Sequence, residues 1–235
     1  KDDSITVKIN GGGPCGTVLA VSDSEGYVRG CIGKADISLP LNKKGKLDVA
    51  GAVGKDGFVT VIKDLGLKEP YIGSTPIVSG EIAEDITSYY AVSEQIPTVC
   101  ALGVLTEHDS GEIICAGGFM IQLLPTADDT VITKVEESIK DLPPVTKMLS
   151  DSLTPEDICR KALSKFNLQM LDETSTAYRC NCSRERVERA LIATGKSGLS
   201  EMAEDDTTEV VCNFCHKKYH FSKEEIQKML KGVQN

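Results

Sequence analysis

The feature that most constrains this chain is a set of four cysteines in its last quarter, arranged as two close pairs. Cys180 and Cys182 make a C-x-C motif. Cys212 and Cys215 make a C-x-x-C motif, and 29 residues separate the two motifs. Two pairs of thiolates are what a tetrahedral zinc ion needs, because each pair supplies two corners. Without metal, the same sulfurs are placed to form two local disulfides. The site is therefore a structural clamp, a redox switch, or both.

Length, charge and composition limit the class of protein and its partners. A chain of 235 residues has room for one main domain and a smaller one. The net charge of −9 and the absence of Trp argue against a nucleic-acid partner, which needs basic residues and stacking rings. No apolar run approaches the roughly 18 residues of a membrane span, so no membrane partner is expected. The chain opens without Met on KDDSITVKIN, a strand already under way, which predicts that native N-terminal sequence is missing.

Five further cysteines lie outside the two pairs. Free cysteine is among the most often buried residue types. We therefore predict small buried hydrophobes at Cys15, Cys31, Cys100, Cys115 and Cys159. An odd total of nine cysteines, with few close pairs, suits a reducing compartment better than a secreted disulfide scaffold. A cytoplasmic protein is expected.

Residues 1–125 alternate short β-rich runs with glycine-rich turns. Because the connections are too short for crossover helices, we predict a largely antiparallel sheet, the main domain of an α+β protein. The predicted strands are ITVKI, TVLAV, YVRGCI, FVTVIKD, PIVSGEI, TSYYAVSEQ, TVCALGVL and GEIICAGGFMIQLL. The GGGPCG segment lacks the Lys-Ser/Thr ending of a phosphate loop, so we interpret it as a tight turn.

The capping residues and helical periodicity within residues 126–178 predict a helical linker. Asp128, Asp129 and Thr130 offer an N-cap for VITKVEESIKDL, and Thr154 followed by a proline begins a second helix. After Phe166 the helical periodicity is lost. Because the region contains few large apolar residues, its stability on its own should be marginal.

Residues 179–235 predict a small α+β domain built around the cysteines. Ser183 can cap a helix that ends at Gly195, and EVVCNFCHKKYHF predicts a hairpin with the C-x-x-C pair at its turn. Ser222 and Glu225 offer a capping box for a last helix. With few large apolar residues, this domain is expected to depend on its metal to fold.

Motifs along nearly the whole chain resemble one known family. CNCSRERVERAL and VVCNFCHKKYHFSKEE resemble the zinc domain of the thirty-three-kilodalton heat shock protein (chaperonin) family, the redox-regulated holdase chaperones of bacteria. TVKINGGGPCG, LDVAGAVGKDGFVTVIKDLGLKEPY, IVSGEIAEDITSYYAVSEQ and AGGFMIQLLP resemble its core domain. The family normally has further N-terminal sequence before the segment where this chain begins.

The resemblance implies a mechanism and a set of partners. One Zn²⁺ per chain would be held, in the reduced and inactive state, by Cys180, Cys182, Cys212 and Cys215. Oxidation would form the disulfides Cys180–Cys182 and Cys212–Cys215, release the metal and unfold the linker. The active homodimer would hold unfolded or oxidatively damaged client proteins and pass them to ATP-dependent foldase chaperones.

Other interpretations of the cysteines stay open. A permanently structural zinc site would use the same four residues. The string CNFCH fits the C-x-x-C-H haem attachment pattern, although Cys180 and Cys182 are then unexplained. A zinc-ribbon nucleic-acid binder needs a basic face, but residues 176–235 carry 10 Lys and Arg against 9 Asp and Glu. Neither His216 nor His220 is expected to be a ligand.

An enzyme is the other class considered. The sequence contains no HExxH, GxSxG or Walker motif. An oxidoreductase built on Cys212 and Cys215 would need the βαβ context of a thioredoxin-like site, which the strand pattern does not provide. We therefore expect a protein that is not an enzyme.

Overall fold

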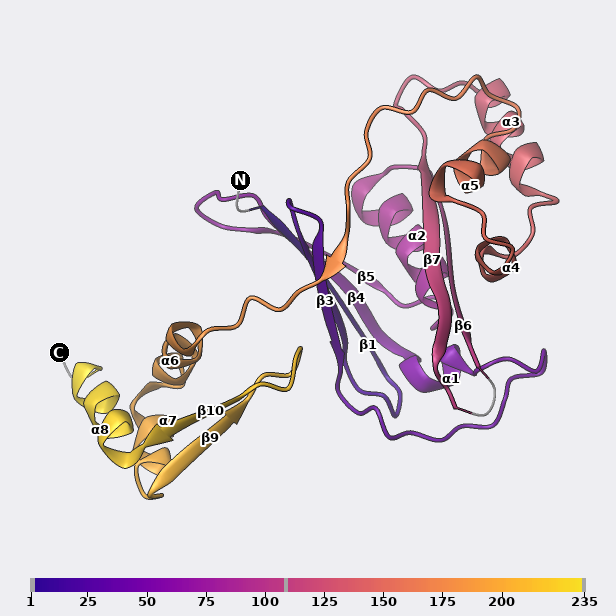
Figure 1. The fold of residues 1–235 in the computed structure, drawn as a ribbon. Coiled ribbons are helices and arrows are strands. Elements are labelled where there is room, and N and C mark those ends of the chain that lie inside the picture. Colours follow the sequence, from indigo (N-terminus) through magenta and orange to yellow (C-terminus); the bar gives the residue numbers. More distant parts are fainter. Residues whose placement is uncertain (1–2, 108–109, 234–235) are drawn as a thin grey trace. The chain divides into compact units, whose positions relative to one another are not determined.

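The computed structural model describes residues 3–107 and 110–233, so the first two residues of the opening segment KDDSITVKIN lie outside it. The chain divides into two compact units (Figure 1). We call Lys1–Ser24 with Ile32–Ser175 the larger unit, and Glu25–Cys31 with Thr176–Asn235 the smaller unit. Both contain helices and antiparallel strands, which confirms the predicted α+β class. The three-part division at residues 125 and 178 stays a prediction.

The larger unit contains an antiparallel sheet with the strand order β5-β4-β1-β2. Its strands are β1 (Ser4–Gly12), β2 (Val18–Asp23), β4 (Gly54–Asp64) and β5 (Tyr71–Pro76). A short helix, α1 (Val49–Val53), directly precedes β4. As predicted, GGGPCG forms a turn, in which the Gly16 N–H donates to the Gly13 carbonyl at 3.1 Å. Ile9 of β1 and Val59 and Val61 of β4 are no more than 3% exposed and form the centre of the core.

The predicted strand TSYYAVSEQ is wrong, because this segment is helical. Helix α2 (Ile82–Tyr89) runs directly into a π-helical turn, η1 (Tyr90–Glu94). Asp85 and Tyr89, four residues apart on one helix face, are 1% and 0% exposed. The Asp85 carboxylate accepts hydrogen bonds from the N–H groups of residues 78, 79 and 80, and the Tyr89 hydroxyl donates to Glu94. Tyr89 also packs in the core with Ile9, Val59 and Val61, and this tertiary packing overrides the strand propensity of the Tyr- and Val-rich segment. Strand β5 accordingly ends at Pro76, so most of the predicted strand PIVSGEI is a loop.

A second antiparallel pair, β6 (Thr98–Thr106) and β7 (Ile113–Gln122), confirms two further predicted strands. Helix α4 (Val145–Ser150) packs against this hairpin where Gly103 faces Gly117 (Figure 1). A Cβ atom at Gly117 would lie 2.9 Å from Leu149 Cδ1, closer than real contacts allow. The helix approaches the strands because these two positions carry no side chain.

Both predicted linker helices are present, as α3 (Asp129–Ile139) and α5 (Pro155–Ala162). Asp128 caps α3, and Thr154 forms a capping box at α5, as expected from the sequence. Helix α4 is not predicted by the pattern, because Pro144 ends the first periodic run and is also the N-cap of α4. Residues 167–176 form neither helix nor strand, in keeping with the loss of periodicity after Phe166.

The smaller unit contains a parallel pair of short strands, β3 (Tyr27–Ile32) and β8 (Ala177–Tyr178), and a later group of elements. The later elements are α6 (Arg184–Ala193), α7 (Gly195–Met202), β9 (Thr207–Val211), β10 (Lys218–Ser222) and α8 (Lys223–Gly232). The caps of α6 and α8 and the β9–β10 hairpin are as predicted. Their buried core consists of Leu191, Leu199, Tyr219, Phe221 and Ile226. The sequence pattern misses α7, whose Leu199 is 0% exposed, so this core is larger than expected.

The cysteines outside the two pairs are buried to different degrees. Cys15 is 1% exposed, as predicted. Four others are only half-buried: Cys31, Cys100, Cys115 and Cys159. Burial raises the pKa of the Cys15, Cys31 and Cys100 thiols above the ordinary value, which makes them poor nucleophiles.

The helices are short, and α3 has 11 residues. Within the described part of the chain, none of them combines the length and the apolar character that a membrane span requires.

Candidate metal centre

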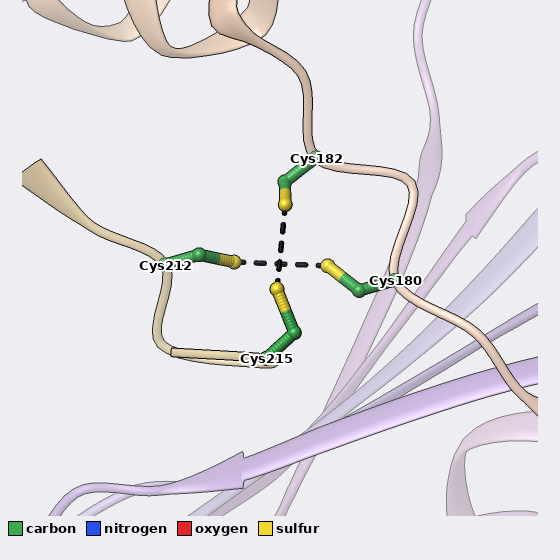
Figure 2. Close-up of side chains that lie close together, drawn as sticks. All are labelled: Cys180, Cys182, Cys212 and Cys215. Atoms are coloured by element: carbon green, nitrogen blue, oxygen red, sulfur yellow. Dashed lines mark hydrogen bonds between the residues drawn. The ribbon is translucent and has the colours of Figure 1, made fainter. Parts of the chain in front are cut away.

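The two cysteine pairs, distant in the sequence, meet in the smaller unit (Figure 2). The four sulfur atoms all lie within 4.8 Å of one another. Two contacts join one pair to the other, at 3.6 Å between the sulfurs of Cys180 and Cys212 and 3.4 Å between those of Cys182 and Cys215. The fold therefore brings together all four residues that the sequence analysis singles out.

This arrangement fits a tetrahedral metal ion. Metal–thiolate bonds of about 2.3 Å place the sulfurs at corners about 3.8 Å apart, close to the separations observed. Four sulfur ligands are typical of zinc or iron, whereas magnesium and calcium prefer oxygen. Among the described residues, the group that could hold an ion contains neither His216 nor His220. The His220 side chain is 62% exposed and lies beside Glu209.

Local backbone structure presents each pair to the centre. The C-x-C pair lies between strand β8 and Ser183, whose side chain accepts the N–H of Arg186 and so caps α6. The C-x-x-C pair lies in the turn between β9 and β10. This turn is closed by hydrogen bonds from Cys212 N–H to the Lys217 carbonyl at 3.0 Å and from His216 N–H to the Cys212 carbonyl at 2.8 Å. Each pair is thus held by a short, hydrogen-bonded segment.

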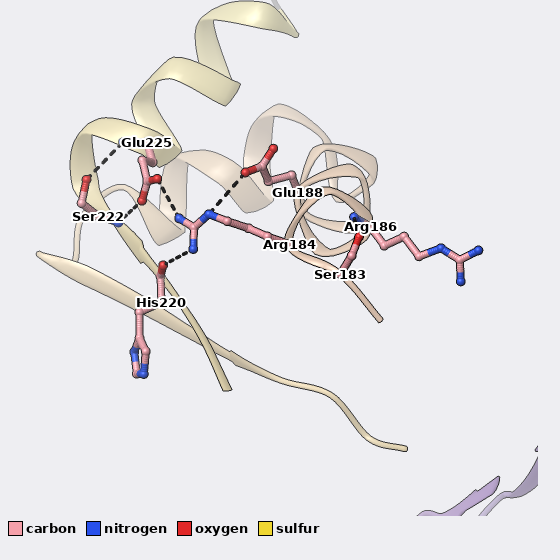
Figure 3. Close-up of polar contacts among 7 residues, drawn as sticks. All are labelled: Ser183, Arg184, Arg186, Glu188, His220, Ser222 and Glu225. Atoms are coloured by element: carbon pink, nitrogen blue, oxygen red, sulfur yellow. Dashed lines mark hydrogen bonds and ion pairs between the residues drawn. The ribbon is translucent and has the colours of Figure 1, made fainter. Parts of the chain in front are cut away.

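Arg184 ties the helix that follows the C-x-C pair to the elements that follow the C-x-x-C pair (Figure 3). Its guanidinium donates to the His220 carbonyl at 2.9 Å and to the Glu225 carboxylate at 2.7 Å. It lies 3.6 Å from Glu188 and 4.2 Å from the centre of the Phe221 ring. A planar cation with several fixed donors sets orientation as well as distance. Helix α6 is therefore held against β10 and α8.

Glu225 has two partners in this network (Figure 3). One carboxylate oxygen accepts from Arg184, and the other accepts from the Ser222 N–H at 2.8 Å. The Ser222 side chain in turn accepts from the Glu225 N–H, which completes the capping box of α8. The Ser222 N–H and the Arg184 guanidinium hold the pKa of Glu225 below its ordinary value, so the carboxylate stays charged in mild acid.

Tyr219 is a partner of the sulfurs that the sequence analysis misses. Its hydroxyl donates to the Cys182 sulfur at 3.1 Å. This hydrogen bond lowers the pKa of Cys182 to about 7 and raises the pKa of Tyr219 to about 12. Burial raises the pKa of Cys180 to about 12, so the two thiols of the C-x-C motif ionise very differently without metal. The signal in the sequence is the alternation of Tyr219 and Phe221, which puts both side chains on one face of β10.

This unequal acidity predicts how metal binding depends on pH. A metal displaces protons from thiols, so its affinity falls as pH falls. Because the pKa of Cys182 is lowered to about 7, this residue is a thiolate above that pH and must lose a proton below it. In a plot of the logarithm of metal affinity against pH, we expect the slope to be about one unit steeper below pH 7 than above it. We call this change of slope the break. In Tyr219→Phe the break should move to higher pH, with about tenfold weaker binding at neutral pH. Chelator competition across this range measures both.

A suitable control is Tyr71→Phe, at a tyrosine of the larger unit that is 48% exposed. Its break should stay near that of the unaltered chain. If the break in Tyr219→Phe also stays there, the hydroxyl does not set the acidity of Cys182.

Comparison with known proteins identifies the family. A family model described as "Hsp33 protein" matches residues 1–222. This chain belongs to the Hsp33 family. A 33 kDa chaperonin of Clostridioides difficile is 50% identical to it over 98% of this chain and 79% of that protein. An Hsp33 relative in Enterococcus faecalis, also named 33 kDa chaperonin, is 45% identical over 96% of this chain and 76% of that protein. The crystal structure of the 33 kDa chaperonin from Thermotoga maritima matches with a TM-score of 0.86 at 39% identity, over 100% of this chain and 80% of that one.

Membership in the Hsp33 family bears on the interpretations left open by the sequence. It supports a chaperone function, which implies binding of unfolded client proteins, and indicates no enzymatic family. The four clustered cysteines are suited to hold a metal ion. The C-x-x-C-H haem pattern does not account for the two further sulfurs, of Cys180 and Cys182, at the same centre.

Proposed function

We propose that this chain is a redox-regulated holdase chaperone, inactive with zinc bound and activated by oxidation. The observation that carries the proposal is the set of four sulfurs within 4.8 Å, supplied by two local pairs. Such a set binds metal when reduced and forms disulfides when oxidised, so one site accounts for two states of the protein. In the reduced state, one Zn²⁺ per chain is held by Cys180, Cys182, Cys212 and Cys215.

Oxidation changes the ligand set by forming two sulfur–sulfur bonds. Bound zinc keeps the sulfurs deprotonated, which leaves them open to strong oxidants. With hydrogen peroxide, each pair of thiolates gives up two electrons to one peroxide, and two protons are taken up to release two waters. We assign the disulfides as Cys180–Cys182 and Cys212–Cys215, because partners so close in the chain stay neighbours even when the fold loosens. Sulfurs in a disulfide are no longer thiolate ligands, so the metal is released.

Metal loss should unfold the smaller unit. A structural zinc ion contributes on the order of 10 kcal/mol of apparent folding free energy. What remains is the core around Leu199 and Phe221 and the Arg184 network. A core in a module of this size supplies only about 3–5 kcal/mol, which does not compensate for the missing ion.

The linker of residues 126–178 should unfold with the zinc domain of residues 179–235. Its last part, residues 167–176, has no regular structure, and Leu171 within it is 86% exposed. A segment with so little buried apolar surface has low local stability. Its release adds exposed apolar side chains for clients to bind.

The β6–β7 hairpin of the core domain, residues 1–125, offers a second apolar surface for clients. Its side chains that are between 44% and 67% exposed include Leu102, Val104, Ile113, Ile114 and Met120. Exposed apolar patches of this kind mark interaction sites. We further propose that the active form is a homodimer in the bacterial cytoplasm, where thiols are kept reduced. Clients are then handed to ATP-dependent foldase chaperones.

One titration tests the proposal by following zinc release, free thiols and client aggregation together. As peroxide is added with mild heat, or hypochlorite alone, we expect one zinc per chain to be released and four thiols to be lost. Light scattering by an unfolding client should fall in the same range of oxidant. A Cys159→Ser variant, which lacks a thiol outside the centre, is the matched control and should behave like the unaltered chain. Zinc and thiol loss with unchanged client scattering would instead support a permanently structural metal site.

A further inference from the structure

We propose that Tyr178 is a positioning residue whose hydroxyl ties the metal-binding turn, residues 212–215, to residues 26–30. This inference rests on the proposed function, since it assumes that the four sulfurs hold a metal. It adds a route by which metal loss is transmitted to a part of the chain that supplies no ligand. We call the contacts among residues 26–30, 177–179 and 214 the latch.

The hydroxyl of Tyr178 lies between two backbone segments. It is 2.6 Å from the carbonyl oxygen of Phe214, the residue immediately before the ligand Cys215. It is also 3.0 Å from the Gly30 carbonyl oxygen and 3.5 Å from the Gly30 nitrogen. A hydroxyl has one proton, and the shorter contact takes it, so Tyr178 donates to Phe214 and accepts the N–H of Gly30.

Backbone pairing holds Tyr178 in register for this role. Strand β8 pairs in parallel with β3, with Tyr178 opposite Val28. The Arg179 N–H donates to the Val28 carbonyl at 3.0 Å, and the Ala177 N–H donates to the Gly26 carbonyl at 3.3 Å. The tyrosine is therefore fixed by main-chain bonds on both sides.

Side chains strengthen the same contact. The Arg29 guanidinium lies 5.5 Å from the centre of the Phe214 ring, so Phe214 is held at its ring by Arg29 and at its carbonyl by Tyr178. The Arg179 guanidinium lies 4.6 Å from the centre of the Tyr27 ring. The turn is thus attached to residues 26–30 through both backbone and side chain.

Each cysteine pair is adjacent in sequence to a residue of the latch, or contains one. Tyr178 precedes the C-x-C pair by two residues, and Phe214 lies inside the C-x-x-C pair. Residues 25–31, in contrast, are followed and preceded in the chain by residues of the larger unit. When the ligands separate, the Tyr178–Phe214 bond loses its geometry and residues 26–30 lose a partner. Metal release thus reaches residues 26–30 through hydrogen bonds of Tyr178, and from there it can continue along the backbone into the larger unit.

The test is Tyr178→Phe, which keeps the ring and removes the hydroxyl. Loss of one hydrogen bond of this kind should make zinc transfer to a chelator roughly three- to tenfold faster, while one zinc still binds per chain. Hydrogen exchange at Gly30 should accelerate by a similar factor. Alkylation of Cys31, which is half-buried next to Gly30, should also accelerate with zinc still bound. In the cobalt-substituted protein the absorption of the metal–thiolate bonds should shift, which a remote structural effect would not produce.

Tyr71→Phe is the matched control, and Arg29→Gln is a second variant expected to change the same readouts in the same direction to a smaller extent. The latch is overturned if zinc transfer, Gly30 exchange and Cys31 alkylation in Tyr178→Phe all equal those of the unaltered chain. A different result, in which the unaltered chain itself binds no metal, overturns the proposed function and the latch with it. Because only the second result involves the unaltered chain, the two failures are distinguishable.

Discussion

Cys182→Ser is expected to abolish stable metal binding and to unfold the zinc domain and the linker while the strands of the core domain keep their structure. Cys182 makes the 3.4 Å contact with Cys215 and accepts the Tyr219 hydroxyl, so its replacement affects both pairs at once. A complete four-thiolate site contributes on the order of 10 kcal/mol, more than a core of this size can replace. Hydrogen exchange read by peptide measures the result. Protection should be lost across β9, β10 and α8 and retained in β1 and β4.

Cys159→Ser is the matched control, because it also removes one thiol, from a half-buried cysteine on α5 in the larger unit. It should keep one zinc per chain and normal exchange in the smaller unit. Persistent protection of the β9–β10 hairpin in Cys182→Ser, with metal absent, would show that the unit folds without its ion.

Phe221→Ala should weaken metal binding even though Phe221 supplies no ligand atom. Phe221 is 0% exposed and packs in the core with Arg184 against its ring. Truncating a buried Phe to Ala costs about 3–5 kcal/mol. If the metal-free unit is unfolded, folding and metal binding are one event. The whole loss of stability then appears as a less favourable free energy of metal binding. At about 1.4 kcal/mol per tenfold, zinc binding weakens roughly 10²- to 4 × 10³-fold. Competition with a chelator of known affinity measures it.

Phe58→Ala makes the same chemical change at an exposed position of the larger unit, where the side chain is 56% exposed. Its zinc affinity should match that of the unaltered chain. Equal affinities in Phe221→Ala and the unaltered chain would mean that the core and the metal stabilise the unit independently.

Local signals predicted much of the fold, and the failures have an identifiable cause. The caps at Thr154 and Ser222 are hydrogen bonds over three residues, so a short motif contains all the groups involved. The strand predicted for TSYYAVSEQ is wrong because Tyr89 is buried in the core with Ile9, Val59 and Val61, an arrangement that the helix provides. That burial depends on contacts with residues from other elements, which a short motif does not contain.

The size of the smaller core shows the same limit. Leu199 and Ile226 each stand in segments of mixed polarity, and neither makes a continuous apolar run. Helices α7 and α8 bring them together with Leu191 of α6 and Phe221 of β10, so the core exists only after four elements pack. Composition therefore underestimated how much apolar surface the unit buries.

By itself, the sequence determined the donor set: four cysteines in two close pairs, of a type and spacing suited to one tetrahedral ion. Only the tertiary structure decided which sulfurs face one another, that Tyr219 donates to Cys182, and that Tyr178 reaches Phe214. The reason is distance along the chain. Spacing within a motif sets geometry over a few residues, whereas these contacts join residues more than 30 positions apart and depend on how the hairpin and helices pack.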